Sequence, residues 1–174
     1  MKSFRRMALA LVGLSLPLAG AATAWFTGDG VAVASTTLVN PHGVNFTLHA
    51  SVDPNFCLED IPAPALPASE ASMSQCINRD GQHWTFADAA DGSIVIIGGN
   101  TGNCLDFTAK VSSPVSMKPC TFSANERFRY NAKGQIELAS GTKCLQPAQA
   151  EQDSIVSIEK CQKGVALQIW MLGH

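Results

Sequence analysis

The sequence has no surplus of basic residues. It carries 12 Lys and Arg residues against 14 Asp and Glu residues, which gives a formal net charge of −2 at pH 7. A nucleic-acid-binding surface draws on clustered basic side chains to pair with phosphates, so this balance argues against a nucleic-acid partner. The densest basic stretch, residues 127–133, alternates with aromatic residues and is typical of the outer face of a strand.

Metal and catalytic motifs are also missing. There is no CxxC pair and the four histidines are scattered, at positions 42, 49, 83 and 174, so we expect no metal site and no cofactor. No Ser-His-Asp or Cys-His arrangement is recognisable. Glu59 and Asp60 are adjacent and would point to opposite faces of a strand, which makes them a poor glycosidase pair. The sequence therefore argues against an enzyme.

Long apolar runs are confined to the N-terminus. Residues 1–24 place three basic residues before an uncharged run over 7–20 and a small-x-small site at 22–24. This order is typical of a cleaved secretory signal peptide, with the mature chain starting at Trp25 or, after a second such site, at Ser35. Nothing after residue 24 resembles a membrane span. We therefore expect a secreted protein, extracellular or periplasmic.

Six cysteines lie beyond this leader, and an even number in an exported chain implies disulfides. Fifteen pairings are possible. The intervals between the cysteines, 19, 28, 16, 24 and 17, alternate short and long. This alternation favours three small rings, each stabilising the fold by about 3 kcal/mol: Cys57–Cys76, Cys104–Cys120 and Cys144–Cys161.

The cysteines mark an internal threefold repeat. A Cys-Leu-polar triplet recurs at 57–59, 104–106 and 144–146, and a polar-x-aromatic triplet follows each ring at 82–84, 126–128 and 168–170. Around them run short segments of alternating polarity, four per copy, divided by turn residues, and no helical stripe appears. We expect an all-β fold of twelve strands, with a flexible lead-in over 25–42 and repeats at about 43–91, 92–133 and 134–174.

The polar-x-aromatic triplets predict a shared core. Trp84, Phe128 and Trp170 would converge from the three repeats. The polar residue two places earlier would lie on the same strand and point the same way, so that when buried it must hydrogen-bond to backbone. Gln82 and Gln168 can donate and accept, whereas a glutamate, which stands at position 126, only accepts when ionised.

The threefold pattern of Cys-Leu-polar, a second cysteine and a polar-x-aromatic triplet, with Cys-Leu-Asp once and Gln-x-Trp twice, resembles the R-type (ricin B-type) lectin family. The resemblance covers residues 43–174. It implies a β-trefoil, in which a six-stranded barrel is capped by three hairpins, and it implies sugar binding in shallow surface pockets, up to one per repeat. Glycans or glycoproteins would then be the ligands.

In this family a pocket uses an acidic residue two past the first cysteine, an aromatic two before the second, and an Asn just before the triplet. In the second repeat these places hold Asp106, Lys118 and Asn125, and Phe107 or Phe122 would supply the missing ring from the loops. The other two repeats match less well, with Glu59, Ser74 and Gly81 in the first and Gln146, Glu159 and Leu167 in the third.

Two functions follow from the resemblance. The first is a secreted carbohydrate-binding lectin whose best preserved pocket lies in the second repeat. The alternative is a protein-interaction or toxin-targeting subunit whose sugar pockets have decayed and which binds a partner protein chain. Fold alone does not decide between them.

Overall fold

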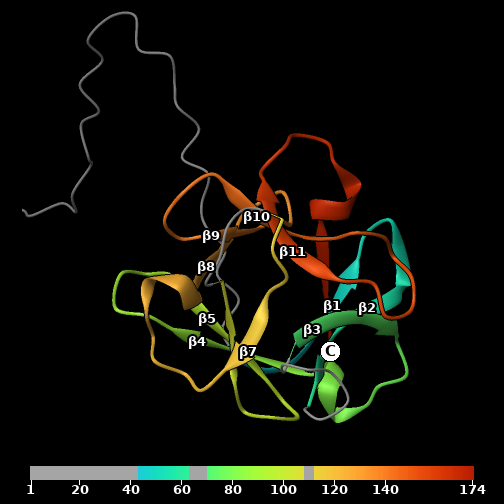
Figure 1. The fold of residues 1–174 in the computed structure, drawn as a ribbon, viewed down its shortest axis with the longest axis horizontal. Coiled ribbons are helices and arrows are strands. Elements are labelled where there is room, and N and C mark those ends of the chain that lie inside the picture. The colour runs from blue at the N-terminus through green and yellow to red at the C-terminus, as the bar shows by residue number, and fades with distance from the viewer. Residues whose placement is uncertain (1–42, 63–69, 108–111) are drawn as a thin grey trace, which may run out of the picture. The chain divides into compact units, whose positions relative to one another are not determined.

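The computed structural model describes residues 43–62, 70–107 and 112–174 (Figure 1). The signal peptide predicted at 1–24 and the lead-in at 25–42 lie outside these residues. The described part of the chain holds twelve strands and three short 3-10 turns, as an all-β fold requires. Within it, no helix is long and apolar enough to cross a membrane.

The twelve strands fall into three sets of four, one set per repeat. The first set is β1 (Gly43–Ala50), β2 (Asp53–Ile61), β3 (Glu70–Gln75) and β4 (Trp84–Asp88). The second is β5 (Ile94–Gly98), β6 (Cys104–Asp106), β7 (Ser116–Lys118) and β8 (Arg127–Tyr130). The third is β9 (Ile136–Leu138), β10 (Lys143–Pro147), β11 (Val156–Lys160) and β12 (Trp170–Gly173).

Six strands pair side by side in the order β12-β1-β4-β5-β8-β9. Trp170 donates its backbone N–H to Gly134 in the β8–β9 turn at 2.8 Å, which brings β12 next to that turn. The other six strands form three antiparallel hairpins, β2–β3, β6–β7 and β10–β11. Single bridges join each hairpin to the other two: Glu70 to Ser116, Ser72 to Ile155 and Pro114 to Ser157. The result is a β-trefoil-like arrangement.

The core forms where the repeats meet. Trp84, Phe128 and Trp170 are fully buried in one hydrophobic cluster, as the triplet spacing predicts. Trp84 donates its indole N–H to the carbonyl of Leu58, and Trp170 donates to that of Leu145, both at 3.1 Å. Each leucine follows the first cysteine of its repeat, so the two halves of a repeat are tied together inside the core.

The polar residues of the triplets do not lie on the strands, which corrects the prediction made from their spacing. Each is the last residue of a 3-10 turn: η1 (Asp80–Gln82), η2 (Ala124–Glu126) and η3 (Ala166–Gln168). Gln82 accepts from the N–H of Ile77 at 2.9 Å and donates to the carbonyl of Gln75 at 2.7 Å. Gln168 likewise accepts from Gln162 and donates to Lys160. Through these hydrogen bonds, each glutamine joins the segment after the second cysteine to the residue before that cysteine.

Glu126 fills the same place in the second repeat and, as predicted, acts as an acceptor. Its carboxylate accepts from the backbone N–H of Thr121 at 2.9 Å and of Ser123 at 3.2 Å. Ser123 and Glu126 together form a capping box on η2. A carboxylate has no N–H to give to Pro119, whose carbonyl corresponds to those of Gln75 and Lys160.

The three predicted disulfides are present. Cys57 bonds to Cys76, Cys104 to Cys120 and Cys144 to Cys161, at sequence separations of 19, 16 and 17. Each bond lies within one repeat and holds the base of its hairpin next to the segment that carries the polar-x-aromatic triplet. The short rings are therefore also the elements that position the candidate binding residues.

Candidate functional site

The β6–β7 hairpin carries the best preserved of the predicted positions. Cys104 pairs with Lys118 and Asp106 with Ser116 across the two strands, so these side chains share the face directed away from the core. Lys118 Nζ lies 2.8 Å from Asp106 Oδ1. The Asp106 side chain is 5% exposed and that of Lys118 is 43% exposed. The carboxylate is thus buried beneath an ammonium group that reaches solvent.

Asn125 is bonded through its backbone to the residue that follows Asp106. It is an exposed residue of η2, and its carbonyl accepts the backbone N–H of Phe107 at 3.0 Å, directly after Asp106. The fold therefore places the turn that carries the amide place next to the end of the strand that carries the acidic place, although Asp106 and Asn125 are 19 positions apart in the sequence.

Phe107 does not serve as a stacking surface, which corrects one of the two sequence predictions for the aromatic. It is 5% exposed and belongs to the hydrophobic core. Lys143 Nζ lies 5.0 Å from the centre of its ring, a cation–π contact from the third repeat. Because Phe107 lies two residues after the core residue Leu105, strand alternation turns both side chains inward.

Phe122 has an exposed ring. It lies between β7 and η2, is 41% exposed and adopts a left-handed backbone conformation with φ of 57°. Its carbonyl accepts two bonds from the Arg127 guanidinium, at 2.9 and 3.1 Å. Arg127 in turn lies 3.5 Å from Asp91, whose pKa is lowered chiefly by the hydroxyl of Ser93. A chain of polar contacts thus fixes the loop that presents the ring.

The first repeat holds a second ion pair of the same design. Glu59, at the acidic place on β2, is ion-paired with Arg79, and their side chains are 7% and 49% exposed. Gln82 donates to the same carboxylate at 3.4 Å. At the amide place, a Cβ on Gly81 would lie 2.8 Å from the carbonyl of Asp60, so the position has no room for a side chain.

Sequence reasoning missed Arg79. It lies three residues after Cys76 in a turn, whereas the cation of the second repeat, Lys118, lies two residues before Cys120 on a strand. The two cations thus reach equivalent carboxylates from different elements. Only the fold shows that both cations pair with the carboxylate at the acidic place, since their distances from the cysteines differ.

The third repeat differs from the other two. At the acidic place, Gln146 accepts from Gln168 at 2.8 Å, so two neutral amides replace the ion pair. Glu159 accepts from the hydroxyls of Ser157 and Ser112, at 3.0 and 3.1 Å. Leu167, at the amide place, is half-buried. This repeat offers neither a carboxylate nor a cation at the central position.

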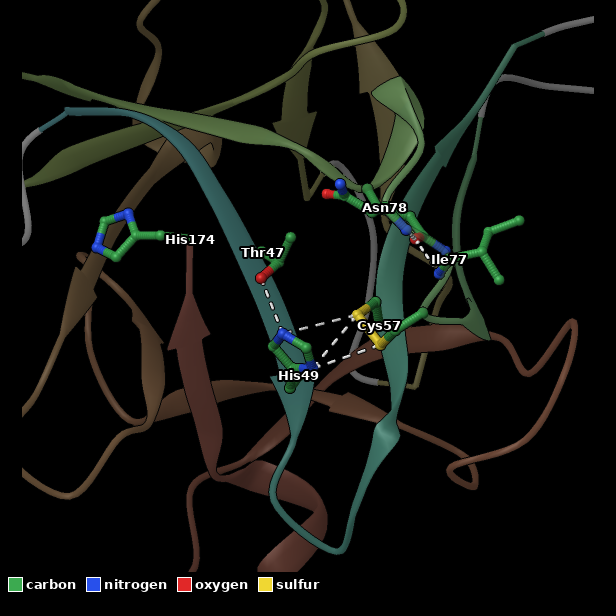
Figure 2. Close-up of a pocket in the computed structure, with 8 residues that line it drawn as sticks. Thr47, His49, Cys57, Ile77, Asn78 and His174 are labelled. Atoms are coloured by element: carbon green, nitrogen blue, oxygen red, sulfur yellow. Dashed lines mark hydrogen bonds between the residues drawn. A yellow bond between two sulfur atoms is a disulfide. The ribbon is translucent and has the colours of Figure 1, made fainter.

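A cavity of about 280 Å³ lies elsewhere on the first repeat, against the Cys57–Cys76 disulfide (Figure 2). His49 points into it, with Nε2 2.8 Å from Thr47 Oγ1 and Nδ1 2.8 Å from the carbonyl of Pro54. Nδ1 also lies 3.4–3.5 Å from both sulfurs. Because the sulfurs are bonded to each other, they are not the thiolate ligands that a metal ion would need.

The cavity is closed on one side by β12. A Cβ at Gly173 would fall 2.7 Å from His49 Nε2, so the last strand packs directly on the Thr47–His49 pair. These contacts hold β1 against β12 and leave the Thr47 hydroxyl shielded. The pair therefore has a role in the fold rather than in chemistry.

Residues 92–174 match the family model of the ricin-type beta-trefoil lectin domain. The second and third repeats are therefore similar to a ricin-type β-trefoil lectin domain. The match spans the second and third repeats, and the first repeat carries the same cysteine ring, leucine and polar-x-aromatic triplet. The sequence resemblance is confirmed by this match. No curated protein matches the chain.

Solved structures share the fold at low sequence identity. The designed threefold-symmetric protein ThreeFoil aligns with a TM-score of 0.64 and 19% identity, over 74% of this chain and 97% of its own. The ricin B-like lectin of Macrolepiota procera, solved in complex with lactose, aligns at 0.62 and 10% identity, over 78% and 98%. A mosquitocidal holotoxin aligns at 0.65 and 13% identity, over 77% of this chain and 17% of the toxin. At such identities the likeness establishes the fold.

Proposed function

We propose that this protein is a secreted carbohydrate-binding lectin whose principal pocket lies in the second repeat. The observation that carries the proposal is the Asp106–Lys118 ion pair on the β6–β7 hairpin, with the backbone of Asn125 bonded to Phe107, the residue after Asp106. The lectin domain match and the lactose complex of the Macrolepiota procera protein support a saccharide as the ligand. The three disulfides and the signal-like leader support export.

Each side chain at the predicted site has a role suited to a sugar. The ammonium of Lys118 has N–H donors beyond the one that Asp106 accepts, and these face solvent. The Asn125 amide both donates and accepts, which matches a hydroxyl. The exposed ring of Phe122 is the candidate platform for the apolar C–H face of the sugar. Asp106 holds the lysine in place from below.

A glycan array on the exported protein tests the proposal. We expect weak binding, in the micromolar to millimolar range, that is abolished by Asp106→Ala and by Asn125→Ala. Glu151→Ala removes an exposed carboxylate from a turn of the third repeat and serves as the matched control. Binding that survives both pocket substitutions would place the site elsewhere. The absence of binding to every glycan would overturn the lectin proposal.

A second candidate is a targeting subunit that binds a partner protein chain. It is favoured by the mosquitocidal holotoxin, in which a domain of this fold makes up a small part of a longer chain. Under this candidate the chain is itself not an enzyme, and any catalytic activity belongs to the partner. Array-negative protein that co-purifies from its source in a fixed ratio with a second chain would favour it over the lectin proposal.

A further inference from the structure

In two repeats, the carboxylate at the acidic place is buried and paired with a more exposed cation. In the first, Glu59 is buried and its partner Arg79 is half-exposed. In the second, Asp106 is buried and its partner Lys118 is half-exposed. The cations come from different elements, a turn and a strand, yet each covers the equivalent carboxylate. The feature common to both pockets is therefore a cation presented to solvent and held by a buried anion.

This arrangement changes what each pocket can recognise. A carboxylate recognises neutral sugar hydroxyls by accepting from them, but here it lies beneath a cation and already accepts from it. The group that faces a ligand is instead a donor. A guanidinium has five N–H donors and an ammonium three, so both retain free donors after the internal ion pair is made. The buried carboxylate also fixes the position of its cation, which lowers the entropy lost when a ligand binds.

We propose that the first and second repeats bind anionic saccharides, through Arg79 and Lys118 acting on a carboxylate or sulfate group, and that the third repeat does not. The inference rests on the proposed lectin function and names its ligand class. In the third repeat, the Gln146–Gln168 amide pair occupies the central position and offers no charge to an anion. The domain thus contains two pockets with a cation and one without, where Glu159 places a carboxylate at the position that Lys118 holds in the second repeat.

We expect the two cationic pockets to differ in their affinity for an anion. Asp80, which is exposed, directly follows Arg79 and opposes the attraction of an anion to the first repeat. In the second repeat, Asn125 adds a neutral donor and Phe122 adds an exposed ring close in sequence to the cation. We therefore expect the second repeat to bind more tightly than the first.

Titration calorimetry on the full-length exported chain tests the inference with three defined probes. These are a uronic acid oligosaccharide, a sulfated oligosaccharide of the same length and neutral lactose. We expect at least one anionic probe to bind tenfold or more tightly than lactose, with an affinity that falls as salt is raised. Lys118→Met should lower the affinity about tenfold, Arg79→Met less, and the two together should abolish binding.

Two further variants keep the result interpretable. Lys133→Met removes the same charge from an exposed turn and should leave binding unchanged, which excludes a general charge effect. Because Lys118→Met leaves Asp106 buried without its cation, the pair Asp106→Asn with Lys118→Met removes both charges and should fold while losing the anionic ligand.

The outcomes separate this inference from the proposed function. If lactose binds as tightly as the anionic probes, or if anion binding survives loss of both Arg79 and Lys118, the inference is wrong while the lectin proposal stands. If no saccharide of any kind binds, both fall together.

Discussion

Asn78 and Phe122 share one backbone conformation, with φ of 58° and 57°, although they belong to different repeats. Each lies two residues after the second cysteine of its ring. Asparagine tolerates this left-handed region, whereas a bulky aromatic residue rarely adopts it. In the second repeat the two hydrogen bonds from Arg127 to the Phe122 carbonyl help to hold the loop in this shape. The chain thus keeps an exposed ring at a position where its backbone is strained.

Replacing Phe122 by asparagine should therefore raise stability while weakening ligand binding. We expect the free energy of unfolding in denaturant to rise by about 1 kcal/mol as the left-handed strain is relieved. Saccharide affinity should fall, because the ring that would cover the apolar face of the sugar is lost. Asn78→Phe, which places a ring on the first repeat, provides the reverse control and should lower stability. An equally stable Phe122→Asn protein with full affinity would contradict both expectations.

Glu126→Gln should leave the fold intact. The amide oxygen can still accept from Thr121 and Ser123, and the new NH₂ group can donate to the carbonyl of Pro119, as Gln82 and Gln168 do in their repeats. We expect stability within about 1 kcal/mol of the parent protein, measured by chemical unfolding.

Glu126→Leu is the matched variant, because it keeps the bulk but leaves the two backbone N–H groups without an acceptor. It should cost about 1–3 kcal/mol, because the part-buried N–H groups of Thr121 and Ser123 lose their acceptor at the buried position 126. Similar stability for the Gln and Leu variants would show that these bonds contribute little.

Gly98→Ala should destabilise the protein, because the added methyl group would clash with the buried carboxylate of Asp60. A Cβ at Gly98 would fall 2.6 Å from Asp60 Cγ, and Asp60 cannot move away without losing its bonds to the N–H and hydroxyl of Thr101, at 2.8 and 2.7 Å. Overpacking of this kind costs about 1–3 kcal/mol. An Asp60→Ala background removes the two closest contacts, those with the carboxylate, and leaves only the Cβ of residue 60 at 2.9 Å, so the same glycine substitution should cost less there. Equal costs in the two backgrounds, measured by thermal unfolding, would rule out the proposed contact.

Tyr130 should make the protein less stable in alkali. Burial raises the pKa of its phenol above 10.0, and the hydroxyl donates to the carbonyl of Trp170 at 2.8 Å. The folded state therefore holds the phenolic proton more tightly than the unfolded state. Its contribution is fully present below the unfolded pKa and is lost as the pH rises through the folded one.

Because Tyr130 is the only tyrosine of the chain, tyrosinate absorbance reports its ionisation directly. We expect an absorbance midpoint above 10.0 in the folded protein and near it in denaturant. Tyr130→Phe should have a flatter dependence of unfolding on alkaline pH than the parent. A folded midpoint at or below that of the denatured chain would contradict the burial argument.

The features that repeat in the sequence are those that could be predicted from it. The cysteine rings and the buried Trp84 and Trp170 recur at regular spacing, and regular spacing in a threefold repeat places residues at equivalent points. The inward position of Phe107 was also within reach of the sequence, because it lies directly after β6 and two residues after the core residue Leu105, so that the alternation of the strand continues to it.

Other contacts depend on the direction that the chain takes after a turn. The spacing of residues in the sequence does not predict that direction. The three triplets read as continuous strands, but each polar residue ends a 3-10 turn, because its side chain must reach the backbone on both sides of the second cysteine. The Glu59–Arg79 pair is similar, since Arg79 meets its partner only after the turn has folded back on β2. Contacts made across turns are thus the part of the site that required the structure.

The pairing of β1 with β12 implies an order for the steps in which this domain folds. Besides its neighbours β2 and β4, the first strand pairs with β12, more than 100 positions later, whereas every cystine joins positions fewer than 20 apart. Local oxidation can therefore run ahead of long-range closure, which is the slower step on grounds of loop entropy. A chain that does not yet include residues 170–173 can complete its rings one by one, but β1 then still lacks its pairing with β12.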